Sequence, residues 1–498
     1  ACSQFSEAYP IFCKDKRFIR FPDASSGKNR NFGKKLRNLC QGTIDQPRIT
    51  GAESVIRVIS PVICFLFFRA EYPIFAKTRR GKFESRRSKN RDVRKNPLRD
   101  ENKQLNLIGM KTNLNYDMFV PTRTLFGAGT LNELHAQPMP GRKALLVISN
   151  GRSTRANSYL SRTEEQLRMA GVETVLFDRV EANPLKSTVM AGGENGCDMI
   201  VALGGGSVMD AAKAIAVVAS NGGDYWDYIP CGTGKGKAVA ETPLPIVAIT
   251  TTAGTGSETD AGCVITNAET HEKTGFVHPG LFPVLAVIDP ELMLTVPPKF
   301  TAFQGFDALF HSTEAYISNA ANLMSDMYAL NAIENVARYL PRAVADGSDL
   351  EARTRVAWGN TLSGSVMCVG RCTSEHSLEH AMSAYHQELP YGAGLIMISK
   401  AYYAHFIERH VCDERFVAMA RALGVEDARE PMDFIRALEA LQRACGVADL
   451  RMSDYGISPD EFPAMVRNAR ETMGFLFPFD REPLSDEECE AIYRASYR

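Results

Sequence analysis

Five short apolar runs recur between residues 143 and 288, and their spacing constrains the fold more than any other feature of the chain. They are Lys143–Ser149, Val172–Phe177, Met199–Leu203, Leu244–Thr250 and Leu285–Ile288. Continuous apolar runs of this length are typical of strands buried on both faces, as in parallel sheets. Between the first two runs, a polar amphipathic stretch at residues 158–170 predicts a helix that Gly171 ends. This order of strand, helix and strand predicts an α/β domain with a mostly parallel sheet.

The texture of the sequence changes after Pro297 and Pro298. Long runs rich in Ala, Leu, Met, Glu and Arg follow at helical spacing, without a convincing strand pattern. We therefore predict an α/β domain at residues 110–296 and an all-helical domain at residues 297–498. A cleft between two such domains is a favoured place for a ligand.

Residues 1–109 differ from the rest of the chain in charge. They contain 24 Lys and Arg against 10 Asp and Glu, a balance of +14 that leaves −15 for the remainder. The apolar run at residues 55–68 is interrupted by Arg57 and Pro61 and is too short to span a bilayer. Met110 is a natural start, so we expect a disordered or non-native extension. The alternative is a basic arm that binds nucleic acid, but aromatic spacing and zinc-type cysteines, which would support it, are missing.

The 12 cysteines are scattered, without a Cys-x-x-Cys pair, and the sequence has no clean secretion signal. Both features predict reduced thiols and a cytoplasmic protein. No segment has the length and apolar character of a transmembrane helix, so we expect no membrane partner.

Two turns rich in glycine and hydroxyl groups follow two of the predicted strands. The first is Gly204-Gly205-Gly206-Ser207, which opens a helix, and the second spans residues 250–258, Thr-Thr-Thr-Ala-Gly-Thr-Gly-Ser-Glu. Glycines let the backbone approach a pyrophosphate, and a helix N-terminus supplies free N–H groups. The first turn does not match G-x-G-x-x-G, so alone it could be a tight connection. Two such turns at the ends of neighbouring strands predict a dinucleotide site.

Two pairs of residues at helical spacing predict a metal site. Asp307 and His311 lie four residues apart in a stretch without Gly or Pro, residues 306–316, so their side chains share one helix face. Downstream, His376 and His380 have the same spacing. An isolated Asp–His pair is most simply a surface ion pair. Two facing helices that both present imidazole favour a metal ion between them.

Four motifs in order, G-G-G-S-x-x-D-x-x-K, T-T-x-G-T-G-S-E, D-A-L-x-H-x-x-E-A-Y and H-S-L-E-H, resemble those of the iron-containing (group III) alcohol dehydrogenases, and the resemblance covers residues 110–498. It implies a Rossmann-like, dehydroquinate synthase-like domain that binds NAD or NADP. It implies Fe(II), or Zn(II), held in the helical domain by one Asp and three His. The implied reaction interconverts primary alcohols and aldehydes by hydride transfer, with the metal as a Lewis acid.

The resemblance also assigns roles to single residues of this chain. Asp307, His311 and His376 match metal ligands. His380 matches a histidine on the substrate side of the metal, and we expect it to relay the proton in catalysis. Asp210 would lie near the nicotinamide and Lys273 near the ribose. The full set of expected cofactor contacts is Ser149, Asn150, Gly204, Gly205, Gly206, Ser207, Asp210, Thr251, Thr252, Thr255 and Lys273.

At one position the chain departs from the family's metal site. Pro390-Tyr391-Gly392 stands where the family has Pro-His-Gly, whose histidine is the fourth ligand. A phenol is normally neutral and a poor ligand. Three arrangements stay open: Tyr391 binds the metal as a phenolate, the site keeps three protein ligands and a water, or His386 supplies the fourth ligand. We expect weakened metal affinity.

A second departure lies at the end of the first predicted strand. Ser149-Asn150-Gly151 stands where family members that prefer NAD tend to carry an Asp for the ribose hydroxyls. Without that acid a 2′-phosphate is not repelled, and Arg152 and Arg155 would favour it. The choice between NAD and NADP therefore stays open.

Two other functions are compatible with the same residues. One is a glycerol- or polyol-type dehydrogenase that uses zinc on this scaffold. The other is a catalytically dead nucleotide-binding homologue, with Tyr391 as the lesion. In each case the expected partners are a small molecule and, because of the apolar faces of the helical domain, further copies of the chain in a dimer or larger oligomer.

Overall fold

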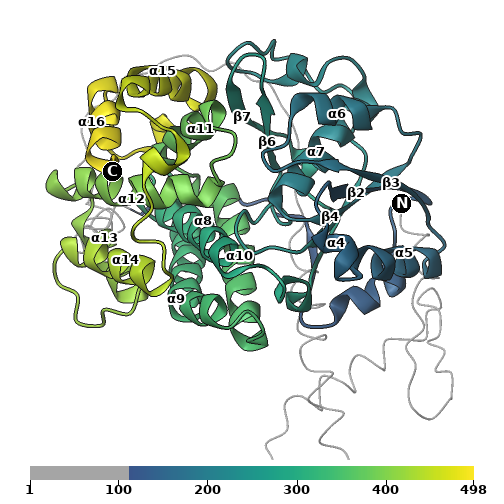
Figure 1. Ribbon diagram of the computed structural model, residues 1–498, viewed down its shortest axis with the longest axis horizontal. Helices are drawn as coiled ribbons and strands as arrows, with labels where there is room; N and C mark the ends of the chain where they lie inside the picture. The colour runs from purple at the N-terminus through teal and green to yellow at the C-terminus, as the bar shows by residue number, and fades with distance from the viewer. Residues whose placement is uncertain (1–111) are drawn as a thin grey trace, which may run out of the picture. The chain divides into compact units, whose positions relative to one another are not determined.

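The computed structural model describes residues 112–498, and all of them belong to one compact unit. The extension predicted at residues 1–109 lies outside the described residues. The described chain runs first through an α/β region and then through a helical region, which confirms the predicted fold class (Figure 1).

A six-stranded sheet in which every neighbouring pair is parallel forms the α/β region. Its spatial order is β1-β8-β5-β4-β2-β3. The strands are β1 (Arg123–Phe126), β2 (Lys143–Ser149), β3 (Glu173–Val180), β4 (Met199–Gly204), β5 (Ile246–Thr250) and β8 (Leu285–Ile288). All five predicted strands are confirmed. The prediction lacks β1, because its residues are exposed or half-buried and form no apolar run.

Both faces of this sheet are covered, as its continuous apolar strands require. In β2, Leu145 and Val147 belong to the core that also contains α7, whereas Leu146 and Ile148 belong to the core that contains α5. The helices of this region are α4 (Ser153–Ala156), α5 (Tyr159–Met169), α6 (Lys186–Gly193) and α7 (Gly206–Asn221). The predicted helix at residues 158–170 is therefore confirmed.

Beside the main sheet, an antiparallel hairpin links the α/β region to the helices. It consists of β6 (Gly262–Asn267) and β7 (Glu272–Val277). In β7, the Thr274 hydroxyl donates a hydrogen bond to the carbonyl oxygen of Thr472, at 2.7 Å. The hairpin thus brings Lys273 next to the helical region.

Every described element after β8 is helical, as the sequence predicts. The α-helices are α8 (Pro298–Ile317), α9 (Leu323–Ala345), α10 (Leu350–Gly370), α11 (Ser374–Tyr385), α12 (Tyr391–Glu408), α13 (Asp413–Ala422), α14 (Met432–Ala444), α15 (Phe462–Met473) and α16 (Asp486–Ser496). No helix within residues 112–498 combines the length and apolar character needed to cross a membrane.

The central element of the helical region is α8, which begins with Pro298 in its first turn, where a missing backbone N–H costs nothing. From residue 301 to 317 every side chain except Gln304 is buried. A helix buried on all sides lies in a protein core. Asp307 and His311 are therefore interior residues, and the alternative of a surface ion pair is excluded.

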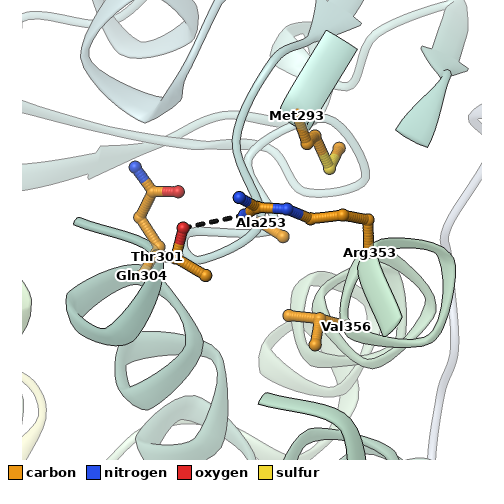
Figure 2. Close-up of a pocket in the computed structure, with 6 residues that line it drawn as sticks. All are labelled: Ala253, Met293, Thr301, Gln304, Arg353 and Val356. Atoms are coloured by element: carbon orange, nitrogen blue, oxygen red, sulfur yellow. Dashed lines mark hydrogen bonds between the residues drawn. The ribbon is translucent and has the colours of Figure 1, made fainter. Parts of the chain in front are cut away.

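A buried arginine fastens α8 to the segment that follows the sheet. Arg353 of α10 donates hydrogen bonds to the Thr301 hydroxyl at 2.7 Å and to the Val296 carbonyl at 3.0 Å. Figure 2 shows the guanidinium reaching Thr301 across a small gap. That gap, about 10 Å³, holds at most a single water. The site is structural, and the domain boundary near Val296 stays a prediction.

Candidate metal and dinucleotide site

The two predicted anion-binding turns lie side by side. Strands β4 and β5 are parallel neighbours, with Gly204 in register with Thr250. The Thr251 N–H donates to the Gly204 carbonyl at 3.0 Å, which joins the turns directly. Because both strands end here, both turns lie at the carboxyl edge of the sheet, where ligands bind in parallel α/β folds.

Glycine is required where the turns meet. A Cβ on Gly205 would lie 2.8 Å from the Thr252 hydroxyl, and one on Gly206 would collide with the Thr255 side chain. Helix α7 begins at Gly206, and Gly205 caps it without a side chain. The first N–H groups of α7 are thus free for a phosphate. The predicted contacts Ser207, Thr251, Thr252 and Thr255 are partly exposed around this cradle.

Asp210 and Lys213 hold the second turn against α7. Asp210 accepts hydrogen bonds from the Ser257 hydroxyl at 2.9 Å and the Val264 N–H at 3.0 Å. The Lys213 amine, fully buried, donates to Ser257 at 2.8 Å and to Asp260 at 2.7 Å. Burial, partly offset by Lys213, raises the pKa of Asp210 to about 7. Both side chains therefore have a structural task, whether or not Asp210 also contacts cofactor.

The end of β2 reaches the same edge, since β2 pairs with β4. Ser149 is half-buried there and Asn150 is exposed. Arg155 forms an ion pair with Asp178 of β3, at 2.6 Å. The sequence analysis did not single out Asp178. Its carboxylate offsets part of the charge that Arg155 would offer a 2′-phosphate.

Three of the predicted metal ligands converge in the interior of the helical region. The Oδ1 atom of Asp307 lies 3.6 Å from Nδ1 of His311 and 3.7 Å from Nε2 of His376. Their side chains are at most 7% exposed. None of these three atoms has a hydrogen-bond partner among the described residues. Buried polar atoms without a partner are costly, and three that face one another fit a bound cation.

Each of the two imidazoles interacts with another group of the protein, and this interaction leaves Nδ1 of His311 and Nε2 of His376 without a partner in the described part of the chain. Nδ1 of His376 donates a short hydrogen bond to Oε1 of Glu314, also on α8. The His311 ring interacts with the backbone of Gly254, in the second turn. A ligating histidine commonly binds a carboxylate or carbonyl through its other nitrogen, which fixes the tautomer and ring orientation.

The electrostatics of the cluster also fit a cation. Burial lowers the pKa of His311 to about 4, so its imidazole is neutral. Burial opposes protonation of His376 as well, but Glu314 and Asp307 outweigh it and raise its pKa to about 10. Burial raises the pKa of Glu379 to about 7. The cluster has more buried negative charge, on its carboxylates, than positive charge. A divalent ion that replaces the proton on His376 would compensate this excess negative charge. The donor set therefore fits Fe(II) or Zn(II).

The predicted catalytic residue, His380, lies one turn further along α11 and is buried. Its Nε2 atom is 2.8 Å from the Tyr391 hydroxyl. The Lys273 amine lies 4.4 Å from the centre of the Tyr391 ring and donates to Ser383 at 2.8 Å. Lys273, predicted near the ribose, is thus held among side chains of the helical region.

The structure bears on the three arrangements considered for the fourth ligand. Tyr391 occupies the first position of α12, and its hydroxyl is engaged by His380. His386 ends α11, and its Nε2 lies 3.1 Å from Glu461. Both side chains therefore have partners other than the converging atoms.

Two further residues at the cluster were missed by the sequence analysis. One is Glu314, which orients His376. The other is Cys372, whose sulfur and one ring nitrogen each of His311 and His376 all lie within 4.8 Å of one another. The available signals were Glu314 three residues after His311, on the same helix face, and Cys372 four residues before His376.

The second turn joins the dinucleotide cradle to the metal cluster. Its Thr255 contacts Gly206, and its Gly254 contacts both His311 and the backbone of Gln304 on α8. The Gly256 N–H donates to the side chain of Asn360 on α10, at 2.8 Å. One loop thus touches the phosphate cradle on one side and a metal ligand on the other.

Comparisons with known proteins agree with this geometry. Residues 121–290 match the family described as iron-containing alcohol dehydrogenase, and residues 301–497 match its C-terminal domain family. The 1,3-propanediol dehydrogenase of Klebsiella pneumoniae is 33% identical over 397 residues, 77% of this chain and 99% of that protein. The NAD-dependent methanol dehydrogenase of Bacillus methanolicus is 30% identical over 371 residues, 71% of this chain and 93% of that protein.

A solved structure shows the same fold. The archaeal halo-thermophilic alcohol dehydrogenase from a Red Sea brine pool is 32% identical, with a TM-score of 0.73, and the match covers 78% of this chain and all of that one. The two domain matches, the motifs around the sheet edge and the Asp–His–His cluster all give the same assignment. The chain belongs to the iron-containing alcohol dehydrogenase family.

Proposed function

We propose that this chain is a metal-dependent, NAD(P)-linked alcohol dehydrogenase that interconverts primary alcohols and aldehydes. Asp307, His311 and His376 hold the divalent ion, and the turns around Gly206 and Thr255 hold the dinucleotide. This proposal rests mainly on one observation. The metal cluster, with its unpartnered atoms, adjoins the second turn, which also completes the phosphate cradle. Hydride transfer requires cofactor and substrate to be held in contact, and this loop supplies that proximity.

When bound, the metal supplies Lewis-acid chemistry at the alcohol oxygen and the nicotinamide accepts the hydride. The chain's own contribution includes the proton path. Burial and the nearby Lys273 charge lower the pKa of His380 well below its usual value, so the imidazole is neutral and can take up a proton at one ring nitrogen only as it releases one from the other. The Tyr391 hydroxyl is hydrogen-bonded to its Nε2 and holds the ring in place. His380 therefore relays the proton away from the substrate.

The named activities of the relatives support a primary alcohol as substrate. Propanediol and methanol both carry a primary hydroxyl, and their dehydrogenases match nearly the full described chain. The glycerol- or polyol-type alternative has the same reaction chemistry and differs in substrate. The catalytically dead alternative differs in metal content, because a cofactor-binding protein without function has no need of a stoichiometric ion.

For the cofactor, the methanol dehydrogenase of Bacillus methanolicus is named as NAD-dependent. The Arg155–Asp178 pair is about half exposed, and such pairs contribute little energy. It therefore offers only weak discrimination against a 2′-phosphate, and either dinucleotide can be accommodated.

The test uses the full chain, purified without oxygen. Metal content is measured by elemental analysis, and reduction of butyraldehyde is followed with NADH and with NADPH. Wild type is compared with Asp307→Ala and with a matched control, Asp427→Ala, at an exposed aspartate of the helical region. We expect about one Fe or Zn per chain and turnover in wild type and the control, and the loss of both in Asp307→Ala. Bound NADH without metal or turnover in wild type would favour the dead homologue.

Two further expectations concern the state of the protein. All eight described cysteines are free thiols, which is usual in a reducing compartment and supports a cytoplasmic location. Large apolar side chains at the start of α9, Leu323 and Met327, are more than half exposed, which supports a homo-oligomer. Size-exclusion chromatography with light scattering measures the oligomer directly.

A further inference from the structure

The metal cluster lacks a fourth protein ligand of the expected kind. Asp307, His311 and His376 supply three donor atoms, while the position that holds a histidine in the family is Tyr391. The Tyr391 hydroxyl is hydrogen-bonded to His380. A phenol has an ordinary pKa of about 10, so it is normally neutral. A buried, neutral phenol is a poor ligand for a divalent ion.

A cysteine lies close to the two histidines of the cluster. The Cys372 sulfur lies within 4.8 Å of ring nitrogens of both His311 and His376. The residue is 8% exposed, and its thiol makes no hydrogen bond with any described residue. The same two histidines carry unpartnered nitrogens, Nδ1 of His311 and Nε2 of His376, and both lie near Oδ1 of Asp307.

One carboxylate positions both Cys372 and His376. Oε1 of Glu314 accepts from Nδ1 of His376, and Oε2 accepts from the backbone N–H of Thr373 at 2.6 Å. Thr373 is the residue next to Cys372 and caps α11. A single side chain on α8 therefore joins the His376 ring to the backbone next to Cys372, and groups behind ligands commonly make such bonds.

We propose that Cys372 is the fourth protein ligand of the metal ion, as a thiolate, and makes up for the histidine that Tyr391 replaces. The inference rests on the metal site of the proposed function. On binding, the sulfur–hydrogen bond breaks, the proton passes to solvent, and the electron pair on sulfur forms the bond to the ion. No oxidation or reduction occurs.

The chemistry of the donor also suits a metal ion. A thiolate is an anionic sulfur ligand, and an anionic donor is attracted to a divalent cation more strongly than a neutral phenol is. A thiol that coordinates a divalent metal is deprotonated outright. An Asp–His–His–Cys set also favours Zn(II), because zinc binds sulfur, nitrogen and oxygen donors tetrahedrally.

The experiment replaces the metal of the full chain with Co(II) and records the absorption spectrum. A cobalt–thiolate bond gives a charge-transfer band in the near ultraviolet that nitrogen and oxygen ligands do not give. We compare wild type with Cys372→Ser and Cys372→His, and with the control Cys368→Ser, whose native thiol donates to the Gly364 carbonyl at 3.5 Å. Tyr391→Phe tests the phenolate.

We expect the band in wild type, Cys368→Ser and Tyr391→Phe, and its absence in both Cys372 variants. Cys372→Ser should bind Co(II) about 10- to 100-fold more weakly, and Cys372→His should recover affinity without the band, because imidazole is also a ligand. The proposal is overturned if wild type binds no cobalt, if bound cobalt shows no thiolate band, or if the band persists in Cys372→His.

The spectrum does not depend on turnover, so the two proposals fail separately. A chain that shows the band and loses it with Cys372, but reduces no aldehyde, keeps the ligand and contradicts the dehydrogenase activity. A chain that reduces aldehyde with cobalt bound, but shows no band in any variant, keeps the activity and contradicts the ligand.

Discussion

The dinucleotide cradle and the metal cluster adjoin one another but are built on opposite principles. The cradle consists of backbone and small side chains at the ends of β4 and β5, and its supporting charges, Asp210 and Lys213, have partners. The metal cluster consists of buried charged side chains, and three of its atoms have no partner. The charged side chains that support the cradle are satisfied by the protein itself, whereas the cluster leaves three buried donor atoms without a partner among residues 112–498.

This difference has a physical origin. A helix N-terminus offers N–H groups that water can solvate until a phosphate replaces it, so the empty cradle costs little. Carboxylates and imidazoles packed inside a helical core have no such solvent, and the free energy of their burial is recovered only when a cation arrives. Changes at the cluster should therefore alter metal binding most, and changes at the cradle should alter cofactor binding alone.

The largest effect is expected from Glu314→Gln. The amide keeps one oxygen acceptor, so it cannot serve both the His376 ring and the Thr373 N–H. Loss of a group behind a ligand typically weakens metal affinity or activity by about 10- to 100-fold. Competition with a metal chelator measures the affinity, and Glu334→Gln, at an exposed position of α9, is the control. An equal loss of NADH affinity, read from protein fluorescence quenching, would contradict the separation of the two sites.

A smaller effect is expected from Gly206→Ala, which breaks the cradle without touching the cluster. The new Cβ collides with Thr255 and pushes the two turns apart. Overpacking of this kind costs about 1–3 kcal/mol of folding stability. If the displaced turns lose about 1 kcal/mol of NADH binding, the dissociation constant for NADH should rise roughly fivefold. Ser220→Ala, at the other end of α7, should leave it unchanged. If Gly206→Ala also lost its metal, the cradle and the cluster would not be independent.

The smallest effect is expected at Asp210, which holds the second turn against α7. It concerns the pH dependence of the free energy of unfolding. Burial raises the pKa of Asp210 from 3.8 to about 7, so between these values the folded protein holds a proton that the unfolded chain has released. The contribution of Asp210 is therefore most favourable at low pH and becomes less favourable as pH rises toward 7. In Asp210→Asn, the free energy of unfolding should decrease less with rising pH than in wild type. We expect the difference to be about 1 kcal/mol, allowing for solvent screening.

Urea unfolding at pH 5 and pH 8, in wild type and Asp210→Asn, measures this change. The amide can still accept from the Val264 N–H and donate toward Ser257, so the fold should persist. A variant whose stability falls with pH as steeply as wild type would show that Asp210 is ionised across this range, and that its place beside Lys213 outweighs its burial.

Much of the fold could be predicted from the sequence alone, because most of its strands and helices have a recognisable pattern within their own stretch of residues. Apolar runs without alternation indicate parallel strands, and the five predicted ones match β2, β3, β4, β5 and β8. The exception, β1, has exposed or half-buried residues and is recognisable only from its pairing with β8. The glycines of the phosphate turn and the four-residue spacing of Asp307 and His311 are equally local signals.

What the sequence by itself determined is therefore the order of the elements, the family, and the residue types available for cofactor and metal. Tertiary structure alone decided which of them meet. In the folded chain, Cys372 and Glu314 lie at the metal cluster. His386 contacts Glu461, and the Tyr391 hydroxyl is hydrogen-bonded to His380. These outcomes depend on contacts between helices that lie far apart in the chain, and no periodicity along the sequence encodes such contacts.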